Sequence, residues 1–173
     1  MNGKLIAVLL GAAFIILGAV VPPASALERG FAQRLLAAHY DERVRVGVER
    51  LAWSERLAAE AQPWADDLAR RGKLEHTSRA ARNASGENLW MSAPGWFAPE
   101  AMIGAFVSEG RYFKPGKFPD VSTTGNWFAV GHYTQVIWPE TREVGCAIGS
   151  SRSHEVLVCR YWPSGNIIGV KVP

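Results

Sequence analysis

The chain has 173 residues and a formal net charge of +3, which is a normal size for one domain once a leader is removed. Its lysines and arginines are scattered among acidic residues, and no basic run is interleaved with aromatic side chains. A nucleic-acid partner is therefore not expected. The chain contains no internal repeats and no low-complexity segments.

Residues 1–26 have the pattern of a secretory signal peptide. Lys4 supplies the positive end, residues 5–21 are apolar or glycine, and Ala-Ser-Ala at residues 24–26 is a small-residue cleavage pattern. The apolar run of 17 residues is at the lower edge for a membrane span, so a retained anchor is the alternative. We expect cleavage, because a proline pair that breaks a helix precedes the small-residue site. Residues 27–173 would then form one secreted domain, extracellular or periplasmic, with no permanent membrane span.

The pattern after the leader predicts two helices. Residues 26–45 have apolar side chains at helical spacing. A connector over residues 46–51 leads to a second helix, which Ser54 can cap and Gly72 can end. Pro63 lies inside this second helix and should kink it, because the proline ring clashes with the carbonyl four residues earlier. We expect both apolar faces to be core.

The middle of the chain predicts a short strand, a third helix and a long loop. Residues 77–85 are polar, and residues 86–91 are compatible with a strand. Pro99 is well placed to open a helix that ends near Glu109. Residues 111–130 contain four glycine or proline residues and several aromatic ones. An ordered loop of that length usually lines a binding or active site.

An unusual string, Gly-His-Tyr-Thr-Gln-Val-Ile-Trp-Pro-Glu-Thr, occupies residues 131–141. Gly131 permits a close backbone approach, and His132 is a candidate metal ligand or proton carrier. The apolar side chains that follow would hold His132 against a core. Pro139 ends any helix at this point, so we expect a short helical piece over residues 132–138.

Two strands, residues 143–148 and 155–161, follow as a hairpin. Cys146 and Cys159 have twelve residues between them, and the midpoint falls in the turn. The two cysteines would therefore lie opposite each other, at a separation compatible with a disulfide. Export to an oxidising compartment favours the disulfide over a pair of buried free thiols.

Three motifs resemble the signatures of one protein group. The string at residues 131–141 looks like its first signature, Cys-x-Tyr-x-Pro-x-Gly-Asn within residues 156–167 resembles its second, and Gly-Glu-Asn-Leu at residues 86–89 matches a third. The group is the CAP superfamily, which includes cysteine-rich secretory proteins, insect-venom antigens and plant pathogenesis-related proteins of class one. The resemblance covers about residues 29–172. The chain has two cysteines, fewer than many eukaryotic members have. In this respect it resembles a bacterial-type single-domain member.

The resemblance implies an α+β fold, a three-layer α-β-α sandwich with a small antiparallel sheet between helices. The order of predicted helices and hairpin agrees with this architecture. The resemblance also implies that four side chains converge on a central cleft: His76, Glu87, Glu109 and His132.

Two imidazoles and two carboxylates admit three interpretations. His76 and His132 could bind a divalent metal such as zinc, with carboxylates or water completing or orienting the site. The four residues could instead perform acid–base catalysis. They could also tie loops to the core, and this structural role is favoured for Glu87. No hydroxyl or thiol is marked as an activated nucleophile. We favour a non-catalytic protein and expect that it requires no cofactor.

Aromatic side chains on both sides of the third helix predict an apolar groove beside the cleft, although such rings are more often core. The rings are Trp96, Phe97, Phe113, Phe118, Trp127 and Phe128. Tyr133 and Gln135 could contact the same ligand or brace the short helix. His39 and His154 are interpreted as an exposed helix residue and a turn residue without a role, and Asn166 as support for a turn.

Relatives of this kind are described as sterol or lipid binders, defence proteins, toxins and, in a few cases, proteases. One fold hosts many activities. The function expected first is a non-catalytic extracellular module that binds a lipid, a sterol, or a cell-surface protein or glycan. The alternatives are a metal-dependent hydrolase at the His/Glu cleft and an exported interaction protein with a vestigial cleft.

Overall fold

The computed structural model describes the backbone over residues 24–173 and the side chains from residue 30 onward. The expected signal peptide therefore lies almost entirely outside the described residues. Within residues 24–173, no helix combines the length and the apolar character that crossing a membrane requires.

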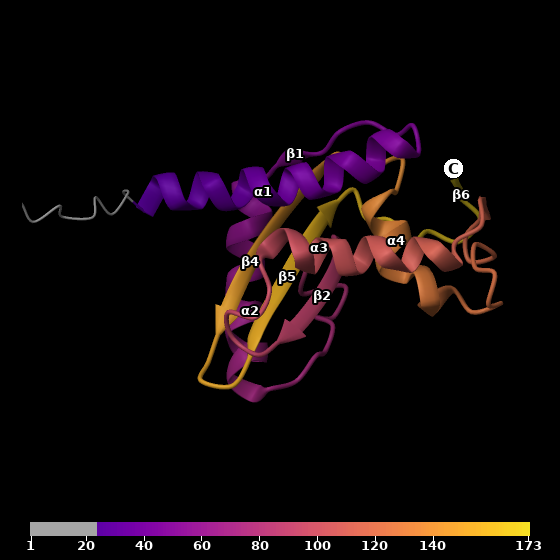
Figure 1. Cartoon of the computed structure of the whole chain (residues 1–173). Coiled ribbons are helices and arrows are strands. Elements are labelled where there is room, and N and C mark those ends of the chain that lie inside the picture. The colour runs from indigo at the N-terminus through magenta and orange to yellow at the C-terminus, as the bar shows by residue number, and fades with distance from the viewer. Residues whose placement is uncertain (1–23) are drawn as a thin grey trace, which may run out of the picture.

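Four helices sandwich a central sheet (Figure 1). Helices α1 (Ala24–Arg45), α3 (Pro99–Ser108) and α4 (Gly131–Val136) lie on one face, and α2 (Glu55–Arg71) covers the other. This arrangement confirms the expected α-β-α sandwich. The predicted α2 bounds are also confirmed, since Ser54 precedes the helix and Gly72 ends it with a left-handed backbone (φ 62°). The helix continues without interruption through Pro63.

The sheet is mixed rather than purely antiparallel. Its strand order is β1-β4-β5-β2. The central hairpin, β4 (Glu143–Ser150) and β5 (Glu155–Trp162), and the neighbour β2 (Gly86–Ser92) are antiparallel. The two-residue strand β1 (Ala52–Trp53) pairs in parallel with the start of β4. The connector after α1 brings the chain back beside β4 in that direction, which the sequence pattern did not indicate.

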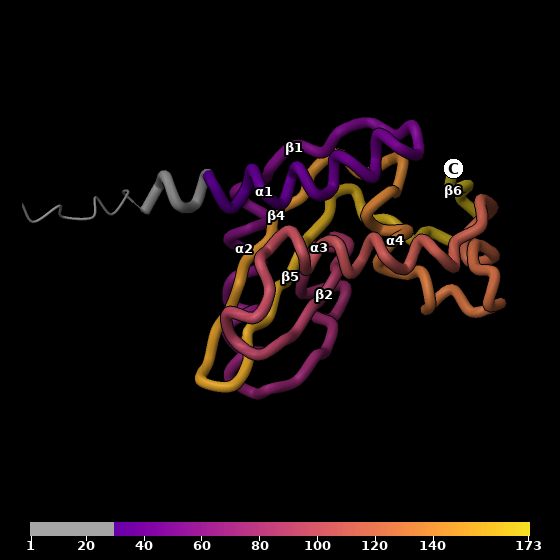
Figure 2. Tube along the Cα trace, in the orientation of Figure 1, coloured from indigo at the N-terminus to yellow at the C-terminus, as the bar shows by residue number. Residues whose placement is uncertain are grey.

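The predicted loop after α3 is built from short elements. They are the 3-10 helices η1 (Glu109–Tyr112) and η2 (Trp127–Val130) and the strand β3 (Gly116–Lys117), which pairs with β6 (Lys171–Val172). The chain trace shows this loop and the C-terminal end side by side at one end of the molecule (Figure 2). The pairing holds the loop over α4.

Strand alternation produces two cores. Val144, Cys146 and Leu157 point to the face covered by α1, α3 and α4. Ala147, Val156 and other intervening residues point to α2. Because both faces of the hairpin are buried, its strands are mostly apolar on both faces, and the buried Arg160 of β5 is the exception within them.

Two glycines on β4 allow α2 to approach the sheet closely. A Cβ added to Gly145 would lie 2.3 Å from the backbone nitrogen of Ala58, and one added to Gly149 would lie 2.2 Å from the carbonyl carbon of Ala65. Both positions therefore require glycine, because the helix backbone occupies the space of a side chain.

The Cys146–Cys159 disulfide is present, which confirms the sequence-based expectation. The two residues are direct partners in the β4–β5 register, with a Cα–Cα distance of 4.1 Å. Both are buried. In the chain-entropy model, a loop of this size contributes about 3 kcal/mol by constraining the unfolded chain.

His39 is buried on the inner side of α1, so its interpretation as an exposed residue was wrong. Its Nδ1 lies 2.8 Å from the carbonyl of Leu35, and its Nε2 lies 2.9 Å from the hydroxyl of Tyr161. The first contact places the ring proton on Nδ1, because a carbonyl only accepts, so Nε2 accepts from Tyr161. Burial lowers the pKa of His39 to about 4, and the ring is neutral at pH 7.

Arg43 is fully buried one helical turn further along α1. Its guanidinium donates to the backbone oxygens of Val136 (2.8 Å), Trp138 (3.0 Å) and Thr141 (3.1 Å), and also to that of Glu49. The carbonyls at a helix C-terminus have no partners inside the helix. Arg43 supplies that partner to the end of α4 and so fixes the orientation of the helix that carries His132. Burial lowers the pKa of Arg43 to about 10, and it remains charged at neutral pH.

Candidate functional site

A cavity of about 380 Å³ opens where the start of β2 meets α4 and the loop after β5. His76, Glu87 and His132 line this cavity, and Trp127 and Phe128 of η2 line it as well. Glu109 does not line the cavity but contacts His132 from behind. The structure thus brings the two histidines and the two carboxylates together in pairs, one pair from each side of the cavity.

The first pair is His76 with Glu87. The Nδ1 atom of His76 lies 2.7 Å from a Glu87 carboxylate oxygen. The backbone N–H and the hydroxyl of Thr77 each donate to the same carboxylate at 3.0 Å. Glu87 stands on β2 directly opposite Arg160 of β5, whose Nη1 lies 3.2 Å from the carboxylate. The loop after α2 is therefore anchored to the sheet through one buried carboxylate.

The Glu87 carboxylate is charged despite its burial. Burial by itself raises the pKa of Glu87, but the hydrogen bond from His76 and the charge of Arg160 act in the opposite direction. Together with Thr77 they leave the pKa below its usual range. A buried carboxylate with this many donors is acceptor-only, as expected for the structural role favoured from the sequence.

The second pair is His132 with Glu109. The Nδ1 atom of His132 lies 2.6 Å from one Glu109 oxygen, and the backbone N–H groups of His132 and Tyr133 donate to the other at 3.0 and 3.1 Å. The imidazole also stacks on Phe106 of α3, with ring centroids 4.9 Å apart. Glu109 thus holds the first turn of α4 and the His132 ring with a single carboxylate.

Both pairs leave the same imidazole atom free. Because each carboxylate accepts from Nδ1, the proton of the neutral ring resides there, and in that form the Nε2 atom carries a lone pair. Neither Nε2 has a hydrogen-bond partner among residues 30–173. The His76 side chain is 56% exposed and that of His132 is 36% exposed. A carboxylate behind Nδ1 is the arrangement that orients histidine as a metal ligand.

The imidazoles of His76 and His132 are the side chains at this cavity that present a free ligand nitrogen. Within the described residues, no group of three or more His, Cys, Asp or Glu side chains is placed to hold one ion. The carboxylates are already engaged by Nδ1 atoms, backbone N–H groups and Arg160. The two imidazole Nε2 atoms are therefore the groups through which a cation could be held at this cavity.

Hydroxyl groups near the cavity are engaged in the framework. Thr77 donates to Glu87 and accepts from Arg160 at 2.9 Å. The hydroxyl of Thr134 lies 2.7 Å from the side-chain oxygen of Asn166. Neither hydroxyl is hydrogen-bonded to an imidazole or positioned as an activated nucleophile.

The aromatic side chains expected to form one groove occupy different places. Only Trp127 and Phe128 line the cavity, with their rings stacked 4.1 Å apart. Phe118 is core and packs edge-on against Trp127, while Phe113 packs against Tyr133. Phe97 contacts Trp90 and Trp96 is 76% exposed, both in the loop after β2. Residues 96–97 follow the end of β2 that is remote from Glu87, which is why they do not reach the cavity.

Tyr133 and Gln135 brace the short helix. Tyr133 is buried, and its hydroxyl accepts from Arg45. Gln135 also lines the cavity, and its side-chain oxygen accepts from the backbone of Gly165 at 3.0 Å.

Asn166 is a cavity-lining residue that sequence reasoning assigned only to a turn. It adopts a positive φ of 57° and donates to the Gly131 carbonyl at 2.9 Å. Its position directly after Gly165, within the second motif, was the available signal, since asparagine tolerates left-handed backbone.

Comparison with known proteins identifies the family. The model of the cysteine-rich secretory protein family, CAP, matches residues 36–161. The chain belongs to the CAP family. It is 34% identical to pathogenesis-related protein 1C of Nicotiana tabacum over 138 residues, covering 79% of this chain and 77% of the relative. It is also 34% identical to secreted protein RBT4 of Candida albicans over 142 residues, covering 80% of this chain and 36% of that relative.

The CAP fold is also found among solved structures. The crystal structure of NaASP2 with Zn²⁺ superimposes with a TM-score of 0.68 at 24% identity, covering 82% of this chain and 84% of that one. This likeness confirms the α+β architecture of the CAP domain.

Proposed function

We propose that this CAP-domain protein is a secreted, non-catalytic binding module, and that the cavity between His76 and His132 receives a lipid or sterol. The observation that supports this function is the two-sided lining of the cavity. The stacked Trp127–Phe128 pair forms an apolar wall, and the imidazoles with Arg79 and Arg82 provide polar and charged groups. Phe128 is 70% exposed.

An amphipathic ligand fits this lining. Its apolar body would cover the exposed ring of Phe128, at about 25 cal/mol per Å² of apolar surface removed from water. Its hydroxyl or carboxylate would face the imidazole Nε2 atoms and the arginines, which are donors or acceptors of the right kind. A cell-surface protein or glycan with an exposed apolar group would use the same wall.

Secretion is supported by the leader pattern, the disulfide and the family. Disulfides persist in oxidising compartments, and relatives of this chain include a protein named as secreted. The single disulfide also supports the proposal that the chain is a minimal, bacterial-type member.

The lipid proposal predicts that Phe128→Ala and Trp127→Ala weaken binding of a labelled sterol or fatty acid by about tenfold each. The physical reason is loss of an aromatic contact face, which contributes on the order of 1.5 kcal/mol. Equilibrium binding to the purified protein is the measurement, with circular dichroism to verify the fold. Trp96→Ala is a matched control, because this exposed indole lies away from the cavity. If neither ligand binds the unaltered protein, a protein or glycan partner replaces the lipid.

A second candidate, a metal-dependent hydrolase, is favoured by the carboxylate–imidazole pairs. Both Nε2 atoms are available, and the fold neighbour NaASP2 was solved with Zn²⁺. Bound zinc would supply a polarised water at the cavity, with Glu87 and Glu109 holding the imidazoles from behind. Two protein ligands are fewer than catalytic zinc sites use, so binding without catalysis ranks first. A vestigial cleft is the remaining alternative.

Zinc is expected to bind with an affinity that falls by tenfold or more in His76→Ala and in His132→Ala. Each substitution removes one of the two candidate ligands. Losing even an outer group that only orients a ligand typically lowers metal affinity by about 10–100-fold, so losing a ligand should cost at least about tenfold. Titration calorimetry measures the affinity, and it should weaken at acidic pH because protons compete for the ligand nitrogens. His154→Ala, a turn histidine outside the cavity, should bind zinc unchanged. Equal zinc binding by all four proteins would assign both cavity histidines to structure alone.

A further inference from the structure

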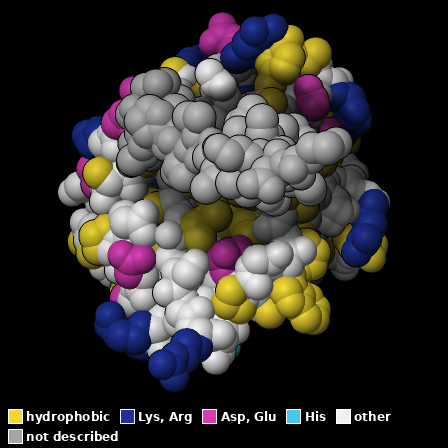
Figure 3. All heavy atoms as spheres, turned by 60° about the vertical axis from the view of Figure 1, so that its left-hand side comes forward, with side chains coloured by type: hydrophobic (Ala, Val, Ile, Leu, Met, Phe, Trp, Pro, Cys, Tyr) yellow, Lys and Arg dark blue, Asp and Glu magenta, His cyan; other side chains and the backbone are white. Residues whose placement is uncertain are grey.

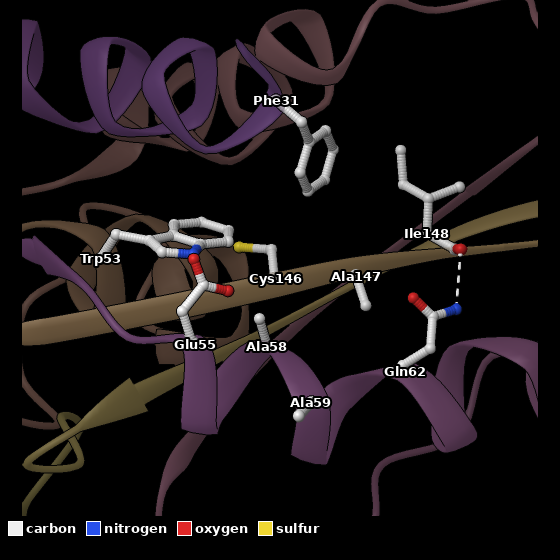
Figure 4. Close-up of a pocket in the computed structure, with 9 residues that line it drawn as sticks. All are labelled: Phe31, Trp53, Glu55, Ala58, Ala59, Gln62, Cys146, Ala147 and Ile148. Carbon is white, nitrogen blue, oxygen red and sulfur yellow. Dashed lines mark hydrogen bonds between the residues drawn. The ribbon is translucent and has the colours of Figure 1, made fainter. Parts of the chain in front are cut away.

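A second cavity, of about 540 Å³, opens at the edge of the sheet between α1 and α2 (Figure 4). Strand β1 pairs only with Glu143 and Val144. Beyond Val144, no other strand among the described residues covers that edge of β4. On the face of the molecule where α1 begins, apolar side chains gather in a hollow with acidic side chains at its margin (Figure 3). Nothing in the His/Glu site uses this cavity, since the two share no lining residue.

The lining of the edge cavity is mostly apolar and leaves room for an aliphatic chain. Phe31 points down from α1, and Trp53 forms one end (Figure 4). Their rings meet edge to face with centroids 6.1 Å apart. The floor consists of small side chains from α2 and β4, namely Ala58, Ala59 and Ala147. Small residues on the floor and large rings at one end form an open trough.

The charge in the edge cavity is negative. Among the residues whose side chains the structure describes, 30–173, Glu55 is the one charged residue in its lining, and no basic residue lines it. Among the described residues Glu55 has no ion-pair partner. Its carboxylate points toward the indole of Trp53 (Figure 4). A carboxylate and an indole ring in one lining can both attract an organic cation, the first by its charge and the second through its ring face.

The far end of the trough also presents an acceptor. The Gln62 amide nitrogen donates to the carbonyl of Ile148 at 3.0 Å and to Asp66 at 2.9 Å. Because the amide nitrogen already donates to these two groups, the side-chain oxygen of Gln62 is the polar atom that it can present to the cavity. The His/Glu cavity, with Arg79 and Arg82 in its lining, has the opposite electrostatic character.

We propose that the edge cavity binds an amphiphile with a cationic ammonium head and a single aliphatic tail. The head lies against Glu55 and Trp53, and the tail runs over the alanine floor toward Ile148 and Gln62. Glu55 and Gln62 are seven positions apart on α2, which corresponds to about 10 Å at 1.5 Å per residue and suits a tail of about ten carbons. A fatty acid is disfavoured, because its carboxylate would meet Glu55 and, among residues 30–173, no cation in the lining.

The test compares three probes by titration calorimetry on protein expressed from the full chain, at concentrations below micelle formation. The probes are decyltrimethylammonium, decanoate and tetramethylammonium. We expect decyltrimethylammonium to bind at least about tenfold more tightly than either other probe, since only it satisfies both the carboxylate and the trough. Glu55→Gln should lose about tenfold for this probe and should bind decanoate no more weakly than the unaltered protein, because the substitution removes the carboxylate that repels it. Glu140→Gln, an exposed glutamate outside the cavity, should bind all probes as the unaltered protein does.

A second variant locates the site independently of charge. Ala59→Leu places a larger side chain on the trough floor at an exposed helix position, and leucine is a good helix former. It should lower decyltrimethylammonium affinity by tenfold or more without unfolding α2. Unaltered affinity in Ala59→Leu, or decanoate binding as tight as the ammonium, would overturn the proposal. An effect of Glu55→Gln on thermal stability alone would also overturn it, because Glu55 would then act only as a favourable charge in the first turn of α2.

Discussion

Arg43→Met is expected to reduce the free energy of unfolding by about 3–5 kcal/mol. Methionine preserves much of the volume but donates no hydrogen bond, so four backbone oxygens lose the Arg43 donor. The oxygens of Trp138 and Thr141 keep a second donor, from Thr141 N–H and Arg142, and the loss is greatest at the buried Val136. Each buried carbonyl left unpaired costs about 1–3 kcal/mol, with partial relief where water enters. Denaturant unfolding measures the loss.

Two control variants separate the contribution of the Arg43 hydrogen bonds to stability from the contribution of its charge and from the general effect of replacing an arginine on this helix. Arg43→Lys retains the charge but reaches fewer of the oxygens, because an ammonium lacks the planar fork, and an intermediate loss is expected. Arg34→Met removes an arginine on the same helix whose partner is Glu100 in an exposed ion pair, and should cost no more than about 1 kcal/mol. A loss below about 1 kcal/mol in Arg43→Met would mean that the end of α4 finds other donors.

Acidification from pH 6.5 toward pH 4 is expected to remove about 3 kcal/mol of stability through His39. Its pKa of about 4 in the folded protein lies below the ordinary value of 6.5. The unfolded chain therefore takes up a proton first, and stability falls as pH drops through this window. The magnitude follows from about 1.4 kcal/mol per unit of pKa shift.

His39→Gln isolates this contribution. Glutamine can hydrogen-bond to Leu35 and Tyr161 but does not titrate, so the variant should be less stable than the unaltered protein at pH 7 and less dependent on pH between 6.5 and 5. Denaturant unfolding at several pH values provides the comparison. His154→Gln serves as the matched control, and should leave the pH profile unchanged. Parallel profiles for the unaltered protein and His39→Gln would contradict a neutral buried His39.

The elements of this fold were predictable where their signals are local. Helical spacing, Ser54 and Gly72 mark α2, and the position of two cysteines about a turn marks the hairpin and its disulfide. The mixed character of the sheet was not predictable, because β1 has only two residues and owes its existence to the neighbouring start of β4.

The candidate site was predictable in its members but not in its pairing. Motif resemblance selected His76, Glu87, Glu109 and His132, whereas the assignment of each carboxylate to one Nδ1 depends on η1 and on the loop after α2. The aromatic groove depended on where β2 ends, which no local pattern specifies.

The buried polar residues of α1 were missed although a signal existed. Leu35, His39 and Arg43 follow one another at intervals of four, so all three lie on the stripe that faces the core. Charge and polarity suggested a surface position, because the partner groups are distant in sequence and their locations could not be inferred.

The span of these partnerships constrains the order in which the chain can fold as it is synthesised. His39 finds Tyr161 122 residues further on, and Arg43 finds Val136 93 residues further on. When α1 leaves the ribosome, the groups that satisfy its buried arginine and histidine have not yet been made. Long-range contacts of this kind are closed late and slow the search for the native topology. Helix α1 can therefore dock fully only after β5 has been synthesised. A chain truncated before Tyr161 would lack the hydroxyl that pairs with His39 on α1.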